Sequence, residues 1–354
     1  MATAAIDEGR FEELMGKALT DIGGATAVLM AYVGDRLGLY RALGSHGPGT
    51  SAEIAAEAGL DERYVREWLS GVAAAGQIDY DPATARFTLS PEAALIYAAE
   101  GDPRCLQGFF QAVKSGYDDE EKATEAIRAG RGLPWGDRSP CCFCGTDRFF
   151  RPGYAVNLVE QWIPAMTGIR EKLEAGAKVA DIGCGHGSST LLMAEAFPRS
   201  HFTGFDFHPP SIDAALAKRD ETDLANVTFE VASAKTFPGT DYDFVCIFDA
   251  IHDMGDPAGA AAHIRRALKP DGSFMIVEPL AGDALEDNLH LLGTIFYGFS
   301  TLACVPASKA QEIGLALGAQ AGEKRLSEVL REGGFGTVRR AAQTDTNMVL
   351  EARA

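Results

Sequence analysis

Cationic residues are scarce in this chain of 354 residues. It has 32 lysines and arginines against 50 aspartates and glutamates, so its formal net charge is −18 at pH 7. Such an excess of negative charge opposes nonspecific binding to nucleic acid phosphates or to an anionic membrane surface. We therefore expect neither nucleic acid nor a membrane among its partners.

Long apolar runs and a disulfide framework are also missing. No uninterrupted apolar stretch approaches the ~18 residues that span a bilayer, and no basic segment with an apolar signal-peptide core opens the sequence. The 7 cysteines are an odd number spread over a long chain, which is not typical of a disulfide-stabilised protein. We expect a cytoplasmic protein. Its length suits two domains, and no internal repeats are apparent.

Glycine is concentrated where a ligand would need it. Residues 179–189 run from an apolar strand into Gly183, Gly185 and Gly187, and a helical pattern follows at once. Alternate glycines let the backbone turn tightly and approach a ligand. The next expected strand ends at Asp206, where a carboxylate can accept hydrogen bonds from both hydroxyls of a ribose. The two features together predict a nucleoside cofactor.

The spacing of the glycines points to one class of nucleoside. A dinucleotide fingerprint reads G-x-G-x-x-G, whereas this chain reads G-x-G-x-G and has Ser188 where the dinucleotide motif needs glycine. With Asp181 just before it, the loop resembles motif I of the class I S-adenosylmethionine (AdoMet) methyltransferases.

From residue 156 onward, expected strands alternate with helices, which predicts a parallel sheet with right-handed crossovers. A helix over 158–173 leads in, and helices over 285–302 and 323–332 separate the fifth strand from the sixth. The fold class is α/β, with a seven-stranded Rossmann-like sheet and a closing hairpin that matches the class I methyltransferase sheet. The expected strands are 178–182, 201–206, 227–231, 244–249, 273–278, 337–344 and 347–352.

The first hundred residues are expected to be mostly helical. Apolar residues from Phe11 to Ile22, and again over 25–43, recur at three- and four-residue intervals, which predicts a pair of helices. Their apolar stripes must pack on the rest of the chain or on a second copy. Residues 51–90 read as helix, turn, helix and hairpin, a winged helix. Between Ser51 and Glu92, eight acids face three bases, a net of −5. This favours packing or dimerisation over DNA binding.

Residues 102–155 are interpreted as a connector and a lid over the active site, between domains at 1–101 and 156–354. Cys141 and Cys144 form a C-x-x-C pair without a second pair or a nearby histidine. We therefore expect no metal site. Burial of the pair in an ordered loop is favoured, and a metal or redox role of Cys141 and Cys144 stays open. The same segment is rich in aromatic residues and arginine and contains Arg151 and Tyr154. An arginine here could pair with the carboxylate of AdoMet or simply lie on the surface.

Over nearly its full length, the chain resembles small-molecule O-methyltransferases that carry an N-terminal winged-helix dimerisation domain. It is closer still to a bacterial, especially actinobacterial, family of winged-helix methyltransferases. The segments that carry this likeness are 34–40, 61–68 and 149–154. The resemblance implies a homodimer, a small-molecule substrate, AdoMet as cofactor and S-adenosylhomocysteine as product.

The resemblance also implies where the cofactor binds. Asp181 and the three loop glycines would line its methionine and sugar, Asp206 would hold the ribose, and Phe207 would lie on the adenine. Ser233 and Ala234 occupy a place where Asp-Ala often contacts adenine, so a serine replaces that carboxylate. Three further residues complete the expected cofactor-binding set: Asp249, Arg151 and Tyr154.

A His-Asp pair follows the fourth expected strand. His252 and Asp253 match the segment in which plant-type O-methyltransferases place their catalytic histidine, although Met254 replaces its tryptophan, and Glu278 matches the acid that orients this histidine. A hydroxyl acceptor must lose its proton, and histidine titrates near working pH. A carboxylate on the other ring nitrogen fixes the tautomer. Alternatively, His252 only closes the strand end; His290 is a second candidate base.

The leading hypothesis is methyl transfer to a small molecule, at a hydroxyl oxygen activated by the histidine. Nitrogen, sulfur or carbon acceptors stay open, and Phe296, Tyr297 and Phe299 suit either an aromatic acceptor or core packing. A transcription regulator that senses AdoMet without catalysis is the alternative from another class, and a scaffold with a retired active site is a third.

Overall fold

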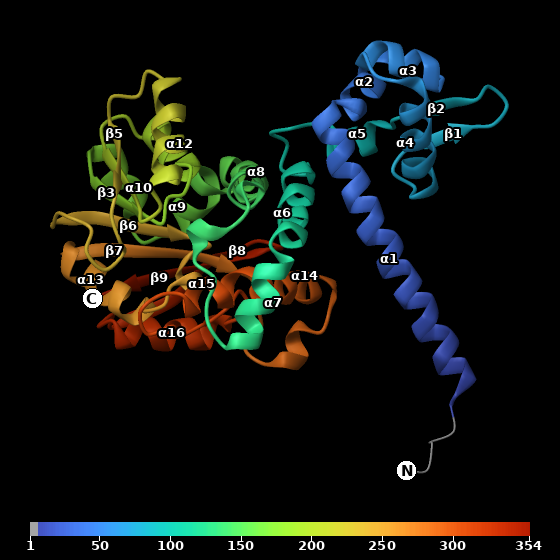
Figure 1. Cartoon of the computed structure of the whole chain (residues 1–354). Helices are drawn as coiled ribbons and strands as arrows, with labels where there is room; N and C mark the ends of the chain where they lie inside the picture. Colours follow the sequence, from blue (N-terminus) through green and yellow to red (C-terminus); the bar gives the residue numbers. More distant parts are fainter. Residues whose placement is uncertain (1–5) are drawn as a thin grey trace. The chain divides into compact units, whose positions relative to one another are not determined.

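The computed structural model describes residues 6–354, which form two compact units (Figure 1). The first unit comprises the chain up to Lys114 together with Cys144–Phe149. The second comprises Ser115–Phe143 and Phe150–Ala354. The expected winged helix lies in the first unit, and the expected catalytic residues lie in the second.

The first unit contains the predicted winged helix. Thr50 and Glu53 cap α3 reciprocally, and Asp61 Oδ1 accepts a hydrogen bond from the Tyr64 amide at the start of α4. Gly59, in the left-handed conformation at φ 67°, ends α3 and makes the turn. The elements are α2 (Leu39–His46), α3 (Ser51–Ala58), α4 (Glu62–Ala74), β1 (Asp79–Asp81), β2 (Arg86–Thr88) and α5 (Pro91–Tyr97).

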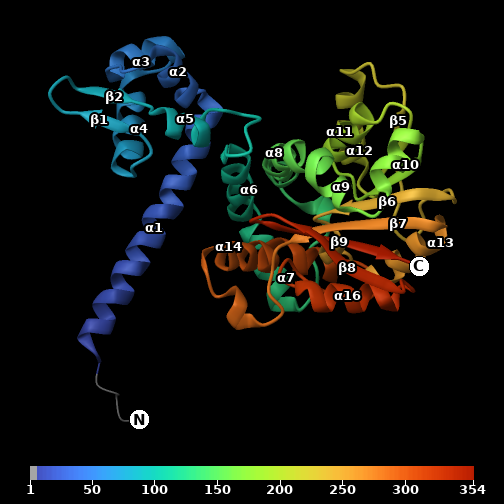
Figure 2. The same ribbon diagram turned by 180° about the vertical axis from the view of Figure 1, so that it is seen from behind.

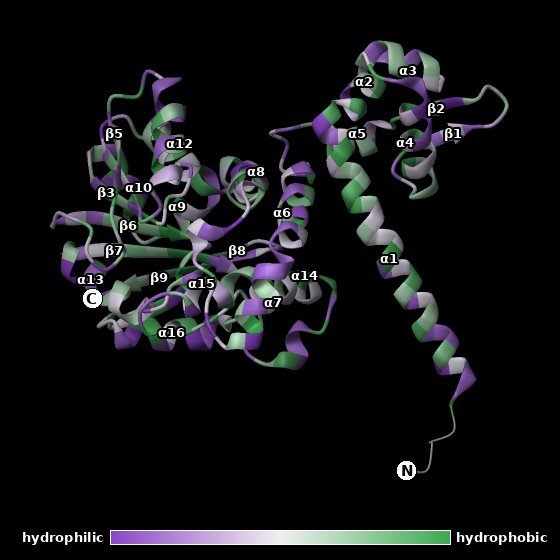
Figure 3. Ribbon diagram, viewed as in Figure 1, coloured by the Kyte–Doolittle hydropathy of each residue, from purple (hydrophilic) through white to green (hydrophobic). Residues whose placement is uncertain are grey.

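The first helix is longer than the sequence predicts. α1 runs unbroken over Glu8–Leu37, so the expected boundary before residue 25 is wrong. Gly23 and Gly24 lower helix propensity there without ending the helix, and the break comes at Gly38, whose φ is 69°. Apolar side chains stay exposed along the helix, among them Phe11, Leu14, Met15, Leu19 and Ile22. In Figure 3, green hydrophobic segments recur along the ribbon of α1.

The segment expected as a connector is mostly helical. It forms α6 (Gln107–Asp118), α7 (Glu120–Ala129), the 3-10 turn η1 (Trp135–Asp137) and α8 (Pro140–Asn157). The sequence shows little periodicity over α8, and Pro152 lies inside it. Ser139 caps this helix and Pro140 stands at its first position, two features that favour a helix start.

The second unit is built on the predicted seven-stranded sheet. The order is β5-β4-β3-β6-β7-β9-β8; the first five strands are parallel, and β9 pairs antiparallel with both β7 and β8 (Figure 2). The strands are β3 (Lys178–Ile182), β4 (His201–Asp206), β5 (Val227–Val231), β6 (Tyr242–Phe248), β7 (Leu268–Pro279), β8 (Thr337–Gln343) and β9 (Asn347–Arg353).

Helices cover both faces of this sheet. Alternate strand residues, such as Val179 and Phe244, pack with α10, α11 and α12 on one face. Their neighbours, such as Ala180 and Val245, pack with α13 and α16 on the other. The crossovers therefore change face between β3 and β6, which is where ligands bind in open α/β sheets. These helices are α10 (Ile169–Ala175), α11 (Ser188–Ala196), α12 (Pro209–Asp220), α13 (Pro257–Ala267) and α16 (Gly322–Glu332).

The single helix expected over 158–173 is broken. The chain forms a π-helical turn, η2 (Leu158–Trp162), and a short α9 (Ile163–Ala165) before Gly168, at φ 69°, precedes α10. Pro164 in α9 and the left-handed glycine explain the interruption.

A second π-helical turn lies between β7 and β8. The 3-10 turn η4 (Leu285–Asn288) leads to α14 (Leu291–Phe299), the π-helical turn η5 (Ser300–Cys304) and α15 (Val305–Lys309). Among the described residues, this run, Leu291–Lys309, is the one helix long and apolar enough to cross a membrane by length and composition. Buried residues make up 39% of its apolar window, and core helices of soluble proteins meet the same criteria.

Candidate active site

The glycine loop follows β3 at the point where the crossovers change face. Gly183, Gly185 and Gly187 all have positive φ, at 70°, 53° and 75°. A Cβ at Gly187 would lie 2.6 Å from the Phe229 ring, so that glycine is needed for packing. A Cβ at Gly185 would meet no atom within 4 Å and would stand in open space. Gly185 is thus the point where a ligand can approach the backbone.

Asp181 lies beneath this loop. Its Oδ2 accepts hydrogen bonds of 2.7 Å from both Ser189 and Thr190 at the start of α11, which ties the helix to β3. Burial raises the pKa of Asp181 to about 6, even though these hydrogen bonds favour the charged form. Within the described part of the chain, the buried Oδ1 has no hydrogen-bond partner.

Asp206 connects the end of β4 to the loop. Its Oδ2 accepts from the Gly185 amide at 2.9 Å and its Oδ1 from the His208 amide at 2.8 Å. Burial raises the pKa of this carboxyl. Phe207 beside it is 52% exposed, so its ring face is available to a planar ligand.

Aromatic side chains pack together at the same end of β4. The buried His208 ring packs on Phe143 with centroids 4.8 Å apart, and Phe143 meets Trp135 edge to face at 5.4 Å. His208 also lies 2.9 Å from Ser211 Oγ through Nδ1. Sequence reasoning missed His208, whose one signal was its place two residues after Asp206.

Two of the expected adenine-side residues sit after β5. Ser233 is exposed and its Oγ accepts from the Lys235 amide at 3.2 Å, which makes it a local cap. Ala234 is partly buried and packs against the core on the face of the sheet that α13 and α16 cover. These contacts of Ser233 and Ala234 leave room for a ligand beside the backbone of the two residues.

Asp249, at the end of β6, joins three elements. It has φ 48°, a strained conformation for a residue other than glycine. Its Oδ2 accepts from Tyr154 of α8 at 2.9 Å, and its Oδ1 accepts from Asn347 of β9 at 2.8 Å. Burial and the charge of Glu278 raise the pKa of Asp249 to about 8. Sequence reasoning missed Asn347.

Arg151, one of the expected cofactor-binding residues, lies one turn before Tyr154 on α8 and is partly buried.

His252 and Asp253, in the 3-10 turn η3 (Ile251–Asp253), meet Glu278 of β7. His252 Nδ1 lies 2.5 Å from Glu278 Oε2, and Glu278 Oε1 accepts from the Ile251 amide at 3.0 Å. His252 Nε2 lies 3.2 Å from Asp253 Oδ1, although no hydrogen bond reaches that oxygen among residues 6–354. Burial opposes the imidazolium, but Glu278 and Asp253 raise the pKa of His252 well above its ordinary value.

Arg138, which sequence reasoning did not single out, supports the neighbouring η5. Its guanidinium is buried and donates from Nη2 to the carbonyls of Leu302 and Ala303 at 2.8 and 3.1 Å. Asp119, also buried, lies 3.9 Å away and itself accepts from the Ser139 amide. The pair therefore fixes the turn that carries Cys304.

The C-x-x-C segment begins α8. None of the seven cysteines is in a disulfide, and burial raises the pKa of Cys142 to about 11. Cys141 and Cys144 belong to no cluster of three metal-ligating side chains within the described residues.

Comparisons with known proteins match two domains of the chain. The family model "Methyltransferase domain" matches residues 173–334, and the model "Rv2258c-like winged HTH domain" matches residues 25–98. A demethylmenaquinone methyltransferase of Listeria monocytogenes is 27% identical over 177 residues, which cover 48% of this chain and 73% of that protein.

Solved structures share the whole fold. The mitomycin 7-O-methyltransferase superimposes with a TM-score of 0.72 at 19% identity, covering 98% of this chain and 100% of the other. Human N-acetylserotonin methyltransferase, in complex with AdoMet, gives a TM-score of 0.72 at 16% identity and covers 100% and 99%. The chain thus carries a methyltransferase domain over residues 173–334 and an Rv2258c-like winged helix-turn-helix domain over residues 25–98, and these matches support an AdoMet-dependent methyltransferase.

Proposed function

We propose that this enzyme transfers the methyl group of AdoMet to a hydroxyl oxygen of a small molecule, with His252 as the general base. The observation that carries the proposal is the pairing of His252 Nδ1 with buried Glu278 at the rim where the glycine loop lies. This pairing leaves Nε2 as the ring nitrogen that can take a proton.

The residues present fit the cofactor. The open space at Gly185 and the carboxyl of Asp206 suit the sugar, and the exposed Phe207 ring suits the adenine. Asp249 with Tyr154 would face the methionine part, and Arg151 would pair with its carboxylate. Gly183 and Gly187 shape the loop, Asp181 ties α11 to β3, and Ser233 with Ala234 would border the adenine.

When bound, AdoMet would supply an electrophilic methyl carbon, and its sulfur would keep the electron pair of the bond to that carbon. His252 Nε2 takes the hydroxyl proton, so that an oxygen lone pair can form the new bond in line with the one that breaks. Glu278 holds the imidazole through Nδ1 and stabilises the imidazolium that forms. Asp253 adds a second negative charge beside the same ring.

The names of the relatives support a small hydroxylated acceptor. One is a 7-O-methyltransferase of mitomycin, and the fold is shared over the full length. Phe296 is buried, and Tyr297 and Phe299 are partly buried on α14, so an apolar or aromatic acceptor fits best. Phe143 packs against His208 and Trp135 meets Phe143, which supports a lid role for part of segment 102–155.

We also propose a cytoplasmic homodimer. Seven cysteines outside any disulfide suit a reducing compartment. The exposed apolar stripe of α1, from Phe11 to Ile22, suits burial against a second copy.

The variant His252→Gln tests whether His252 is the general base. We expect turnover on a hydroxyl substrate, found by screening phenols and hydroxyquinones with AdoMet, to fall by about 10²-fold or more. Calorimetric affinity for AdoMet should stay unchanged. His201→Gln, at an exposed position at the other end of β4, is the matched control. Full turnover by His252→Gln would remove the residue as the base.

A further inference from the structure

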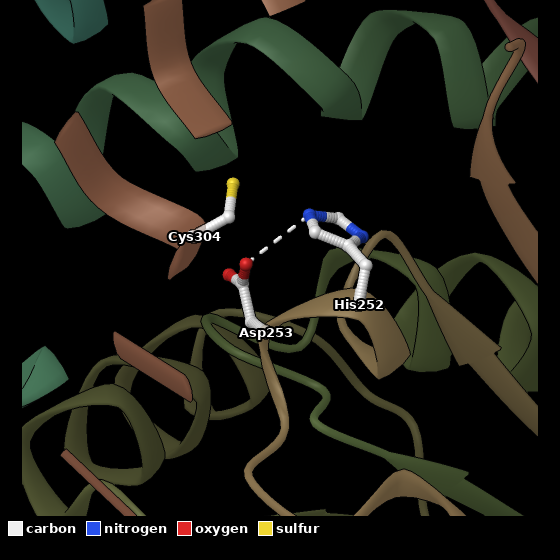
Figure 4. Close-up of side chains that lie close together, drawn as sticks. All are labelled: His252, Asp253 and Cys304. Atoms are coloured by element: carbon white, nitrogen blue, oxygen red, sulfur yellow. Dashed lines mark ion pairs between the residues drawn. The ribbon is translucent and has the colours of Figure 1, made fainter. Parts of the chain in front are cut away.

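A cysteine that the methyl-transfer proposal does not use lies beside the histidine. Cys304 ends the π-helical turn η5 and is buried. Figure 4 shows its side chain together with His252 and Asp253. One nitrogen, one carboxylate oxygen and the Cys304 Sγ all lie within 4.8 Å of one another. Imidazole, carboxylate and thiolate are the side chains that bind Zn²⁺ in proteins.

We propose that His252, Asp253 and Cys304 bind a thiophilic divalent cation, for which Zn²⁺ is the reference ion, and that its binding inhibits the enzyme. The inhibition rests on the proposed base role of His252, because a cation on Nε2 prevents that nitrogen from taking a proton. The binding itself does not depend on that role.

The spacing of two ligands already suits a tetrahedral ion. His252 Nε2 and Asp253 Oδ1 are 3.2 Å apart. Two bonds of about 2.0 Å at a tetrahedral angle separate their ligand atoms by about 3.3 Å. Cys304 Sγ lies within 4.8 Å of both atoms, so the thiol can supply the third corner.

The surroundings of the histidine match those of a metal ligand. Glu278 occupies Nδ1 at 2.5 Å, and its other oxygen is held by the Ile251 amide. A carboxylate on the far nitrogen is the usual support of a metal-bound imidazole, since it orients the ring and raises its basicity. This arrangement leaves Nε2 directed toward the other two ligands.

A buried carboxylate oxygen also lies in the cluster. Asp253 Oδ1 meets His252 Nε2 at 3.2 Å, and no hydrogen bond of regular geometry reaches this oxygen among residues 6–354. Its side chain is 22% exposed overall, so part of this carboxylate reaches solvent. The carboxylate and a Cys304 thiolate together neutralise a charge of +2, and the thiol proton leaves to solvent on binding.

The backbone that presents the thiol is rigid. Arg138 binds the carbonyls of Leu302 and Ala303, directly before Cys304. The adjoining Asp119 lies within 3.9 Å of that guanidinium and offsets its charge. A fixed turn favours binding because little ordering remains to be done when the ion arrives.

The binding test uses the full chain, freed of any purification tag and of metal, titrated with Co²⁺ as a coloured substitute for Zn²⁺. We expect one equivalent to produce a thiolate-to-cobalt absorption band that Zn²⁺ abolishes. Cys304→Ser should remove the band and weaken Zn²⁺ binding at least tenfold, whereas Cys144→Ser, at an exposed cysteine, should keep both. No stoichiometric band, or the same band in Cys304→Ser, would overturn the site.

The inhibition test compares turnover with and without one equivalent of Zn²⁺. We expect wild-type turnover to fall at least tenfold and to recover with a chelator, while Cys304→Ser resists the ion. Equal inhibition of both proteins, or faster turnover with Zn²⁺, would overturn the inhibitory role. Because the cobalt spectrum needs no acceptor, failure of the hydroxyl methyl-transfer proposal would not be mistaken for failure of the site.

Discussion

Carboxyl groups at the strand ends do different work according to what surrounds them. Asp206 accepts two backbone hydrogen bonds, one of them from the glycine loop, while Asp249 is held by two side chains from elsewhere in the fold. Buried carboxyls of this kind resist ionisation unless a cation or donors compensate them. Each therefore gives a distinct prediction.

Asp206→Asn should weaken AdoMet binding by about tenfold or more, because the amide cannot accept hydrogen bonds at both of its positions from the loop and the ribose. Isothermal calorimetry measures the loss. Asp223→Asn, at an exposed position on the chain before β5, should bind as the wild type does. An unchanged affinity in Asp206→Asn would contradict its assignment to the ribose.

The buried carboxyl of Asp249 should make the stability of the folded protein depend on pH. Its pKa is about 8 in the folded protein and about 3.9 in an unfolded chain, so between these values only the folded state holds the proton. Stability from this group is full below pH 4 and is lost as the pH rises toward 8. Asp249→Asn should therefore gain at least ~1 kcal/mol relative to wild type between pH 5 and pH 8.

Urea unfolding of both proteins without AdoMet, at pH 5 and at pH 8, checks this difference. Asp223→Asn should show no such trend, since that side chain is exposed. A stability difference for Asp249→Asn that is the same at both pH values would show that the carboxyl is ionised throughout.

At the scale of the element, Gly187 and Gly185 of the glycine loop lack a side chain for different reasons. Gly187→Ala should lower stability by about 3 kcal/mol, because its φ of 75° disfavours alanine and the new Cβ meets Phe229. Gly185→Ala adds its Cβ to open space and should lower stability by only about 1–2 kcal/mol. Its AdoMet affinity should nevertheless fall at least tenfold.

Thermal unfolding and calorimetry on the two variants test the distinction. The order matters more than the magnitudes: Gly187→Ala should be the less stable protein, and Gly185→Ala should fold normally while binding poorly. Wild-type affinity in Gly185→Ala would mean that the cofactor does not pass this point of the loop.

The elements that sequence predicted best are those whose ends are set locally. β3, β4 and β5 begin and end where predicted, because each is a short apolar run bounded by polar residues or glycine. α1 was misjudged at Gly23 and Gly24, since propensity alone does not show that a long helix tolerates two glycines. The two π-helical turns are not marked by any local pattern in the sequence.

The site was predictable only in part for a different reason. The loop glycines, Asp206 and the His252–Glu278 pair follow from motifs at strand ends, where parallel strands bring their termini together. Asn347 reaches Asp249 from β9, and Cys304 reaches His252 from a separate helical run. Such contacts depend on tertiary packing, which no periodicity reveals.

At the scale of the whole molecule, α1 predicts a homodimer. Its exposed apolar stripe includes Leu19 and Ile22, while Thr20 points to the opposite face of the helix. Wild-type protein should be a dimer by light scattering at micromolar concentration, and the double variant Leu19→Glu with Ile22→Glu should be monomeric. Thr20→Glu should stay dimeric, and a monomeric wild type would refute the proposal.

The π-helical turn of η5 has a consequence that no substitution can reproduce. Such a turn holds one residue more than a regular helical turn. Were the same sequence wound from Leu291 to Lys309 as an ordinary α-helix, every side chain would be kept, yet Cys304 would lie about 100° further around the helix axis, away from the imidazole. The chemistry gathered there is thus a matter of helical phase.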